Sequence, residues 1–346
     1  MTYTKSLMWG ENIRNKDELR AETIRGYVRE INVLHQLRNL PEPIDLKDKK
    51  SPIGLLIHNL QQEEDVARRR NPVTPEMAVA LIQRGQRAEL TSKDALIRDL
   101  IIISSEMGPR AAEVVQTTRS RPDVHQYPSG KTVIKSICRD WFTCYDKNKR
   151  RVLNPIKRRK AVQDIEIAWK IQKNCRNGDK GWYTRTRCPG KLKVVEALIN
   201  MFDRAVQLGP PNHLPLAVYR NDKGVVRYLT RDELTKAIRK AAKEAHGDMT
   251  KNELSLLSCH SLRVWAAVLL HEAGKDGDYI KIRLRWVSEA YRVYLRNTRT
   301  SAKLHNEALR EVFHKIIGEL DKESLPETVD YQAKEDVDMG DYIDPE

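Results

Sequence analysis

The residues with the greatest chemical potential lie in "HSLRVWAAVLLHEAG", residues 260 to 274. His260 and Arg263 are three positions apart, and residues at this spacing share one face of a helix. Ser258 is expected to cap that helix at its N-terminus. Two hydrogen-bond donors at a helix N-terminus make a binding site for a phosphate. As an isolated pair, however, they are more typical of an ordinary protein surface.

Aromatic residues follow closely in "LRWVSEAYRVYLR", residues 284 to 296. The indole N–H of Trp286 is a donor that never changes charge, although a lone Trp is more often a core residue. If residues 286 to 296 form one helix at about 100° per residue, Tyr294 lies about 80° round from Trp286 and Tyr291 about 140°. Tyr294 is therefore predicted to share a site with Trp286, while either ring could instead pack against the protein body.

Two further signals lie upstream. The stretch "GPRAAEV" places Arg110 near a helix start, where free backbone amides also favour an anion. The stretch "AWKIQKNCRNGDKGW", residues 168 to 182, contains an Asn-Gly pair, which strongly indicates a hairpin. Lys170, Lys173 and Lys180 gather around this turn, where a lysine can donate a proton or bind a phosphate. Each signal alone is also typical of a solvated surface.

The elements that must position these residues are mainly helical. Apolar residues recur at three- and four-residue steps from 20 to 39, and prolines then separate further helical stretches. Residues 131 to 188 are instead β-branched and aromatic with partial alternation, which predicts short strands. The expected fold class is therefore α+β, with helices around a small antiparallel sheet. The expected domains are a small all-helical DNA-binding unit at 1–88, a catalytic domain at 89–318 and an acidic, disordered tail at 319–346.

The charge of the chain points to a polyanionic partner. The net charge is +14, and residues 319 to 346 hold eleven acids against Lys322 and Lys334, a local net of −9. Residues 1 to 318 therefore carry +23, which favours nucleic acid as the partner, with simple solubility as the alternative.

The cysteines and the N-terminus limit the compartment and the class of site. The five cysteines are irregularly spaced without a CxxC pair, which argues against a zinc site or a disulfide framework. The polar N-terminal stretch has no signal-peptide core, and no apolar run is long enough to span a membrane. These features predict an intracellular protein with free thiols and no membrane contact.

In combination, the order Arg, hairpin Lys, His-x-x-Arg, Trp, Tyr resembles the catalytic set of the tyrosine recombinase (phage-integrase-like) family. The stretch "LRWVSEAYRVYLR" is most similar to the Crypton-type mobile-element branch, and the resemblance covers roughly residues 20 to 300. It implies a catalytic set consisting of Arg110, Lys173, His260, Arg263, Trp286 and Tyr294. Glu113 is the acid of the "G-x-R-x-x-E" box, and Trp286 stands where many relatives have a second His. Lys180 and Tyr291 remain the alternatives to Lys173 and Tyr294.

The resemblance implies a site-specific DNA recombinase or integrase that cleaves and rejoins DNA through a 3′-phosphotyrosyl link, without metal, ATP or another cofactor. Its implied partners are double-stranded DNA and further copies of the chain, as a tetramer of two pairs. A domesticated protein that binds DNA without cutting it and a type IB topoisomerase-like nicking enzyme are the alternatives. A helix-turn-helix regulator would fit the charge but leaves the hairpin and Tyr294 unexplained.

The implied roles follow from phosphoryl chemistry. Two arginines, Arg110 and Arg263, would stabilise the negative charge of the transition state, because guanidinium groups stay charged and bind in a bidentate manner. His260 would help to move the tyrosine proton, and Lys173 would protonate the leaving 5′ oxygen. The N-terminal helices and the catalytic unit are expected to hold opposite faces of the duplex through phosphate contacts.

Two more segments have open interpretations. The basic run "KNKRRVLNPIKRRK", residues 147 to 160, is interpreted as a DNA-facing surface, a nuclear import signal or a solvated loop. The amphipathic stretch at 300 to 320 is expected to dock on a neighbouring protomer or to pack on its own domain. The expected location is intracellular and nuclear.

Overall fold

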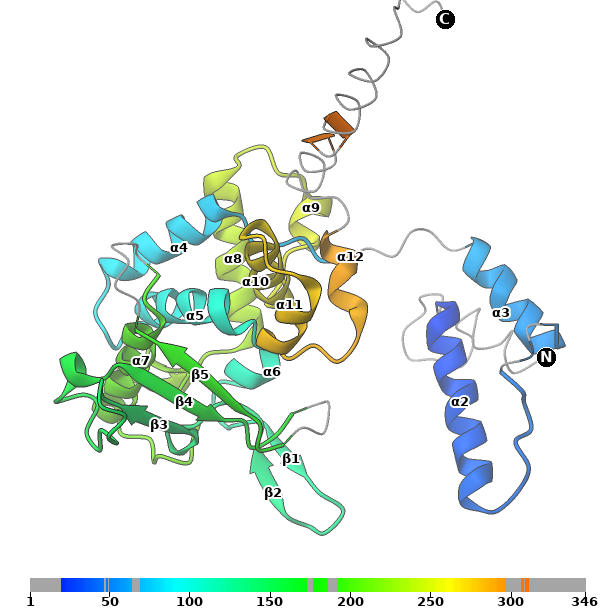
Figure 1. The fold of residues 1–346 in the computed structure, drawn as a ribbon, viewed down its shortest axis with the longest axis horizontal. Helices are drawn as coiled ribbons and strands as arrows, with labels where there is room; N and C mark the ends of the chain where they lie inside the picture. The colour runs from blue at the N-terminus through cyan, green and yellow to red at the C-terminus, as the bar shows by residue number, and fades with distance from the viewer. Residues whose placement is uncertain are drawn as a thin grey trace, which may run out of the picture. The chain divides into compact units, whose positions relative to one another are not determined.

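The computed structural model describes residues 20–46, 48, 50–63, 69–172, 177–185, 192–295, 306–307 and 309–310. The chain divides into two compact units, Met1–Arg69 and Arg70–Glu346 (Figure 1). None of the helices within the described ranges combines the length and apolar character needed to cross a membrane.

The first unit contains two described helices, α2 (Ala21–Leu37) and α3 (Pro52–Glu63). They bury a small apolar core made of Ala21, Ile24, Ile57 and Leu60. The side-chain amide of Asn32 donates to Glu42 at 3.2 Å and to the carbonyl of Ile44 at 2.6 Å, which fixes the loop after α2. The described residues of this unit therefore contain helices and connecting loops.

The second unit is mainly helical. Its helices are α4 (Pro75–Gln86), α5 (Lys93–Met107), α6 (Ala111–Val114), α7 (Val194–Leu208), α8 (Arg231–Ala245), α9 (Lys251–Ser255), α10 (His260–Glu272), α11 (Gly277–Arg283) and α12 (Arg292–Leu295). The side chain of Ser92 caps α5 by accepting from the amide of Ala95 at 3.3 Å. Helix α5 is almost wholly buried, and α4, α7 and α10 pack against it.

Three small antiparallel sheets complete the unit. Their strands are β1 (Val124–Gln126) with β2 (Thr132–Ile134), then β3 (Phe142–Tyr145), β4 (Asp164–Ala168) and β5 (Lys180–Thr184) in the order β3-β4-β5, and β6 (Val218–Arg220) with β7 (Val226–Tyr228). Strands β4 and β5 form the hairpin expected around the Asn-Gly pair, with Ala168 opposite Lys180. The α+β class with a small antiparallel sheet is therefore confirmed.

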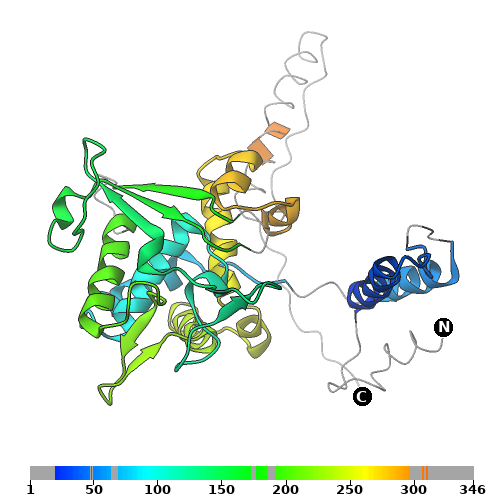
Figure 2. The ribbon, with the colours of Figure 1, turned by 90° about the horizontal axis from the view of Figure 1, so that it is seen from below.

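Helix α7 lies alongside the β3-β4-β5 sheet in both views (Figures 1 and 2). The rings of Phe142 on β3 and Phe202 on α7 meet edge to face at 5.0 Å, which joins the sheet to the helical core. A second, smaller apolar cluster contains Ala266, Ala267, Ile280, Leu284 and Tyr291, and it joins α10, α11 and the segment before α12. This smaller cluster underlies the candidate site.

The boundary between the compact units differs from the one predicted after residue 88. Helix α4 belongs to the second unit because its buried Met77, Leu81 and Ile82 join the main core against α5. The preceding segment is also bonded there, since the amide of Asn71 donates to the carbonyl of Leu256 at 3.1 Å. Residues 70 to 88 therefore form part of the unit that carries the site.

Several predictions concern residues outside the described ranges. These are Lys173, almost all of the stretch at 300–320, and the tail at 319–346. Among the described cysteines, Cys138, Cys144 and Cys259 are buried free thiols.

Candidate active site

Arg110 is positioned by the end of α5. Gly108 ends that helix in the left-handed region at φ 49°, and a Cβ there would lie 3.0 Å from Leu284 Cδ2, so the turn requires glycine. The chain then enters α6, where the Glu113 carboxylate accepts from the Arg110 amide at 2.8 Å and from Arg110 Nη1 at 3.0 Å. Arg110 is held by its own backbone and by Glu113, with its side chain still 25% exposed.

Arg263 reaches the same turn from α10. Its side chain is buried at 2% exposure, and Nη1 donates to the Gly108 carbonyl. The guanidinium also stacks over Trp286, 4.3 Å from the ring centroid. No carboxylate among the described residues lies within ion-pair distance of it, although a buried cation normally needs one.

The electrostatics of Arg263 reflect this environment. Burial, together with the neighbouring charges of Arg110 and Arg285, lowers the pKa of the Arg263 guanidinium to about 9, although Glu113 opposes the shift. The group therefore remains cationic at neutral pH. A bound phosphate would supply the negative counter-charge that no described carboxylate provides to Arg263.

His260 and Tyr294 meet at the start of α10. The Nε2 atom of His260 lies 3.1 Å from the Tyr294 hydroxyl, and the His260 amide donates to the Ser258 hydroxyl at 3.2 Å. Burial lowers the pKa of His260, and the charges of Arg263 and Arg70 act in the same direction. His260 is therefore neutral near pH 7, and in the tautomer that carries its proton on Nδ1 the Nε2 lone pair can accept the phenolic proton.

The two tyrosines lie in different environments. Residues 286 to 295 do not form the single helix assumed in the sequence argument, because a 3-10 turn at Glu289–Tyr291 precedes α12. Both phenol rings consequently lie 6.3 Å from Trp286, so the predicted angular difference does not separate them. The two tyrosines differ in burial instead. Tyr291 is 1% exposed, and a Cβ on Gly277 would collide with its hydroxyl. Tyr294 is only partly buried and touches His260.

Arg285 is a further member of the site that the sequence analysis missed. Its Nη2 atom donates to Glu113 Oε2 at 2.9 Å, and its carbonyl accepts from Arg263 Nη2 at 3.5 Å. Burial raises the pKa of Glu113, but Arg285 and the Arg110 amide lower it by more, so Glu113 stays ionised. The only sequence signal for Arg285 is its place directly before Trp286.

The structure therefore brings together most of the predicted set. His260 contacts Tyr294, Tyr294 contacts Trp286, and Trp286 stacks on Arg263. Arg110 joins this series only through Glu113 and Arg285. We call Arg110, Glu113, Arg263 and Arg285 the arginine cluster. Its single carboxylate, Glu113, pairs with Arg110 and Arg285 but not with Arg263, which leaves an excess of positive charge beside the Tyr294 phenol. Such an arrangement suits a phosphodiester and a tyrosine nucleophile.

The structure describes two of the three hairpin lysines, Lys170 and Lys180. Lys173 lies outside the described residues, between Gln172 and Asn177. Lys180 lies on β5 and forms an ion pair with Glu166 at 3.1 Å, and Lys170 pairs with Asp140 at 2.5 Å. Both described lysines therefore already form ion pairs with carboxylates of this unit.

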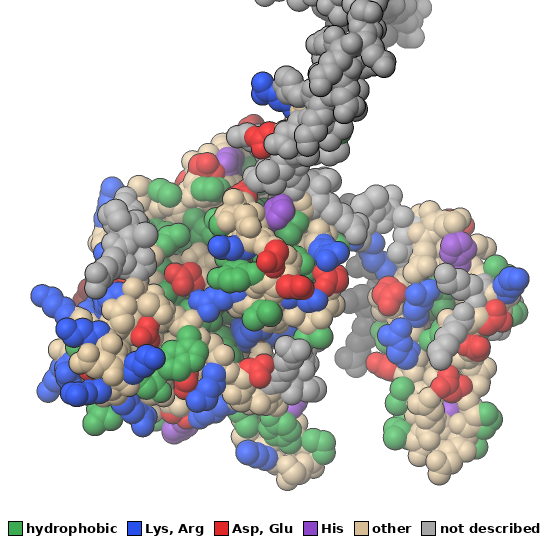
Figure 3. Space-filling model, viewed as in Figure 1, with side chains coloured by type: hydrophobic (Ala, Val, Ile, Leu, Met, Phe, Trp, Pro, Cys, Tyr) green, Lys and Arg blue, Asp and Glu red, His purple; other side chains and the backbone are tan. Residues whose placement is uncertain are grey.

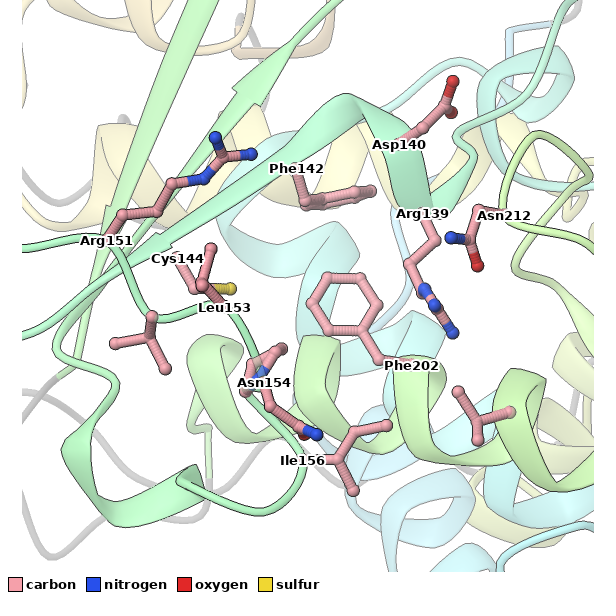
Figure 4. Close-up of a pocket in the computed structure, with 13 residues that line it drawn as sticks. Arg139, Asp140, Phe142, Cys144, Arg151, Leu153, Asn154, Ile156, Phe202 and Asn212 are labelled. Atoms are coloured by element: carbon pink, nitrogen blue, oxygen red, sulfur yellow. The ribbon is translucent and has the colours of Figure 1, made fainter.

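A cavity of about 530 Å³ lies apart from these residues (Figure 4). It is lined by Phe142 and Phe202, whose rings meet edge to face, and by Arg139, Arg151 and Asn212; none of its lining residues belongs to the arginine cluster. In the described part of the chain, no three His, Cys, Asp or Glu side chains gather as a metal site would require.

No protein-family model matches the chain, and no curated protein matches it. Among solved structures, the Tn1549 transposon integrase in complex with transposon right-end DNA overlaps 89% of this chain and 84% of its own, at 11% identity and a TM-score of 0.47. The XerA recombinase overlaps 90% and 89% at 14% identity and a TM-score of 0.38. The XerH site-specific recombinase bound to difH overlaps 88% and 75% at 16% identity and a TM-score of 0.35. At such low sequence identities and TM-scores, these overlaps describe only the course of the backbone and give no information on the chemistry of the site.

Proposed function

We propose that this protein is a DNA strand-breaking and rejoining enzyme, a site-specific tyrosine recombinase. The single observation that carries the proposal is the Tyr294 hydroxyl, 3.1 Å from His260 Nε2 and beside the arginine cluster. A phenol has an ordinary pKa near 10 and needs a base and an electropositive site to attack a phosphate. This site supplies both.

In the first step Tyr294 Oη attacks the phosphorus atom of a DNA phosphodiester, and His260 Nε2 accepts the phenolic proton. The new bond joins the tyrosine oxygen to phosphorus, and the bond from phosphorus to the 5′ oxygen breaks. The energy of the broken diester is kept in the 3′-phosphotyrosyl link. A 5′ hydroxyl from another strand reverses the reaction, so neither ATP nor a metal enters this chemistry.

The arginine cluster stabilises the charge that develops on the non-bridging oxygens. Arg263 is the main contributor because no described carboxylate pairs with it, and Arg110 contributes from a partly exposed position. The indole Nε1 of Trp286 is buried without a hydrogen-bond partner among the described residues. It is the neutral donor proposed for one further phosphate oxygen.

The 5′ oxygen leaves as a hydroxyl and needs a proton. We assign that proton to Lys173, which directly follows Gln172 at the base of the hairpin tip. Lys180 is the less suitable donor, because its ammonium group is paired with Glu166 on strand β4. General-acid catalysis of this kind contributes about 10²- to 10⁴-fold to a rate.

Covalent selection on DNA tests the proposal and requires no defined target sequence at the start. A library of short random-sequence duplexes, each nicked so that the cleaved 5′-hydroxyl fragment diffuses away, is incubated with the full chain. Adducts that survive denaturation are isolated and their DNA is sequenced. We expect adducts on a defined subset of sequences, whereas stoichiometric duplex binding with no adduct would favour a domesticated protein that binds DNA without cutting it.

The selected site, placed twice in a supercoiled plasmid, then separates two enzyme classes. Deletion or inversion products support a recombinase. Relaxation without recombinant products supports a type IB topoisomerase-like nicking enzyme with the same covalent chemistry.

We also propose a Crypton-type mobile-element origin and action in the nucleus on double-stranded DNA, as a tetramer of two pairs. The support for this origin is the eight-residue step from Trp286 to Tyr294 within "LRWVSEAYRVYLR". The support for nuclear import is the basic run at 147–160, most of whose lysines and arginines are exposed. Figure 3 shows Lys and Arg side chains gathered on the side of the second unit that carries β3.

A further inference from the structure

Two arginines from distant parts of the sequence, Arg70 and Arg239, meet at the turn that leads from α9 into α10. We call them the arginine pair. We propose that the arginine pair binds a second phosphate of the cleaved strand, next to the scissile one, and thereby holds the DNA in register with Tyr294. This inference rests on the proposed function and adds to it a binding site outside the catalytic set.

Both members of the arginine pair bond the same backbone oxygen. Arg70 Nη1 donates to the carbonyl of Ser255, and Arg239 Nη2 donates to the same carbonyl at 3.4 Å. Arg239 Nε adds a bond to the Leu257 carbonyl at 3.0 Å. The two guanidinium groups therefore lie side by side, although one comes from the segment before α4 and the other from α8.

The backbone on both sides of this meeting point is anchored. The amide of Asn71 donates to the Leu256 carbonyl at 3.1 Å, and the amide of Val73 donates to the Ser261 carbonyl at 3.4 Å. These bonds hold the segment after Arg70 along the start of α10. Helix α8 is anchored through its buried apolar face, which joins the main core. Side chains on such rigid supports are suited to a preorganised binding site.

The charge of the arginine pair is not balanced by the protein. No ion pair within the described ranges includes either residue, and the carboxylate of Glu244, also on α8, pairs with Arg84 and Lys240 instead. Two like charges that share one carbonyl repel each other, because a carbonyl oxygen carries only a partial negative charge. Capping of the last carbonyls of α9 accounts for one arginine, whereas two unneutralised arginines indicate an anion.

The donors of the arginine pair suit a phosphate. A guanidinium has five N–H donors, of which Arg70 uses one and Arg239 two in the bonds to described residues. Arg70 is exposed and Arg239 is half-buried, so solvent and a ligand reach the first more easily. Forked donors of this kind bind phosphate oxygens in a bidentate manner.

The arginine pair lies within electrostatic reach of the candidate active site. Burial lowers the pKa of His260 most, and the charges of Arg263 and Arg70 lower it further. His260 Nε2 lies in turn 3.1 Å from the Tyr294 hydroxyl. Each strand of a duplex carries one phosphate per about 3.4 Å of helix axis, so the scissile phosphate has charged neighbours close by. The arginine pair is the described anion site beside His260 that such a neighbour can reach.

The chemical need is for register. Tyr294 must face one phosphorus atom, and contacts with flanking phosphates fix the position of a protein along a duplex. A misplacement of about 1 Å costs roughly 10²-fold in rate, so a phosphate held next to the scissile one serves both affinity and cleavage.

The test removes the charge of single phosphates at the DNA site recovered by covalent selection. Each of the two phosphates on either side of the scissile one, on the cleaved strand, is replaced in turn by a neutral methylphosphonate. Duplex affinity is measured by fluorescence anisotropy for the full-length wild type, Arg70→Met and Arg239→Met. Single-turnover adduct formation is measured on the same duplexes.

We expect each variant to weaken binding of the unmodified duplex by about tenfold, as the loss of a charged hydrogen bond does. The slope of log affinity against log salt concentration should fall by about 0.9, the change for one phosphate contact. At one methylphosphonate position the wild type should lose a similar affinity, and there neither variant should lose more, because the partner charge is already absent.

Arg84→Met is the matched control. Arg84 also bonds a residue of α8, but its guanidinium is paired with the Glu244 carboxylate. We expect this variant to follow the wild type on every duplex.

A further loss by both Arg70→Met and Arg239→Met at every modified position would show that these arginines act only through the fold, and would overturn the inference. The same non-additive pattern in Arg84→Met would overturn it as well. An absence of wild-type adduct on the unmodified duplex would instead contradict the proposed function, and the affinity comparison could still be made. Thermal unfolding identifies any loss of folded protein, and the exposed Arg70 provides the test if Arg239→Met does not fold.

Discussion

Two clusters in the second unit are built from the same residue types and differ in what they leave free. Between α5 and α7, Asp99 pairs with Arg204 at 2.5 Å and with Arg98 at 2.7 Å. We call these three residues the buried cluster, because Asp99 and Arg204 are 0% exposed. In the arginine cluster, Glu113 likewise pairs with two arginines, but a third, Arg263, has no described carboxylate partner.

This difference in how the arginines are paired determines what each cluster can do. Arg204 directs Nε to the Leu90 carbonyl at 2.6 Å and Nη2 to Asp99, and Asn200 adds a further bond to Asp99 at 3.2 Å. The partners of Arg204 among the described residues are a carbonyl and a carboxylate, so it fixes α7 on α5. The arginine cluster instead has surplus positive charge, a partly exposed Arg110 and the His260–Tyr294 pair beside it. Only the second arrangement can receive an anion and act on it.

The largest expected effect is on stability, in the buried cluster. Arg204→Met removes one partner of a fully buried pair and leaves Asp99 with a charge that Arg98 alone must balance. We expect a loss of about 3–5 kcal/mol in the free energy of unfolding, measured by denaturant titration. Adduct formation per folded molecule should stay unchanged. Loss of adduct formation in fully folded protein would mean that this cluster also serves the reaction.

Next in size is an effect on rate, in the arginine cluster. Arg263→Ala should lower single-turnover cleavage by about 10²- to 10³-fold, because it removes the donor without a carboxylate partner from the transition state. Duplex affinity, measured by fluorescence anisotropy, should fall far less, since many other cations contact phosphates. Arg263→Lys serves as a second variant that keeps the charge but not the forked geometry. Equal losses of rate and affinity would reduce Arg263 to a DNA anchor.

A smaller effect tests whether Tyr291 is a packing residue. A Cβ on Gly277 would collide with the Tyr291 hydroxyl, so Gly277→Ala should lower the free energy of unfolding by about 1–3 kcal/mol. Tyr291→Phe should restore most of that loss in the double variant, because it removes the contacted oxygen. Additive losses in the double variant would contradict the close packing of Tyr291.

The smallest effect concerns pH. Burial, then Arg263 and Arg70, hold the pKa of His260 below 6.5, so the proton-accepting form dominates at pH 7. As the pH falls below that lowered pKa, His260 becomes protonated and cleavage should fall by roughly tenfold per pH unit. His260→Gln should be slower and should lack this acidic limb. An acidic limb that persists in His260→Gln would assign the ionisation to another group.

Local signals made much of this fold predictable from sequence. The Asn-Gly hairpin between β4 and β5 and the His260–Arg263 spacing on α10 both depend on a few neighbouring residues. The boundary between the two units was harder to predict from sequence. Helix α4 belongs to the second unit because of long-range packing, which no local sequence signal records.

Within the site, the unpredictable features are those that depend on backbone conformation and distant partners. A 3-10 turn at Glu289–Tyr291 alters the expected helical phase between Trp286 and Tyr294. Arg285 depends on a positive φ and on Glu113, 172 positions away in sequence. Neither a periodicity nor a short motif records such features, so Arg285 emerges only from the side-chain contacts.

The most direct test of the central claim identifies the tyrosine that becomes attached to DNA. Nicked duplexes from the covalent selection are incubated with the wild-type chain, Tyr294→Phe and Tyr291→Phe, and adducts are resolved after denaturation. We predict adducts with the wild type and with Tyr291→Phe, none with Tyr294→Phe, and a DNA-linked peptide that contains Tyr294. An adduct that survives Tyr294→Phe and disappears in Tyr291→Phe would contradict the account.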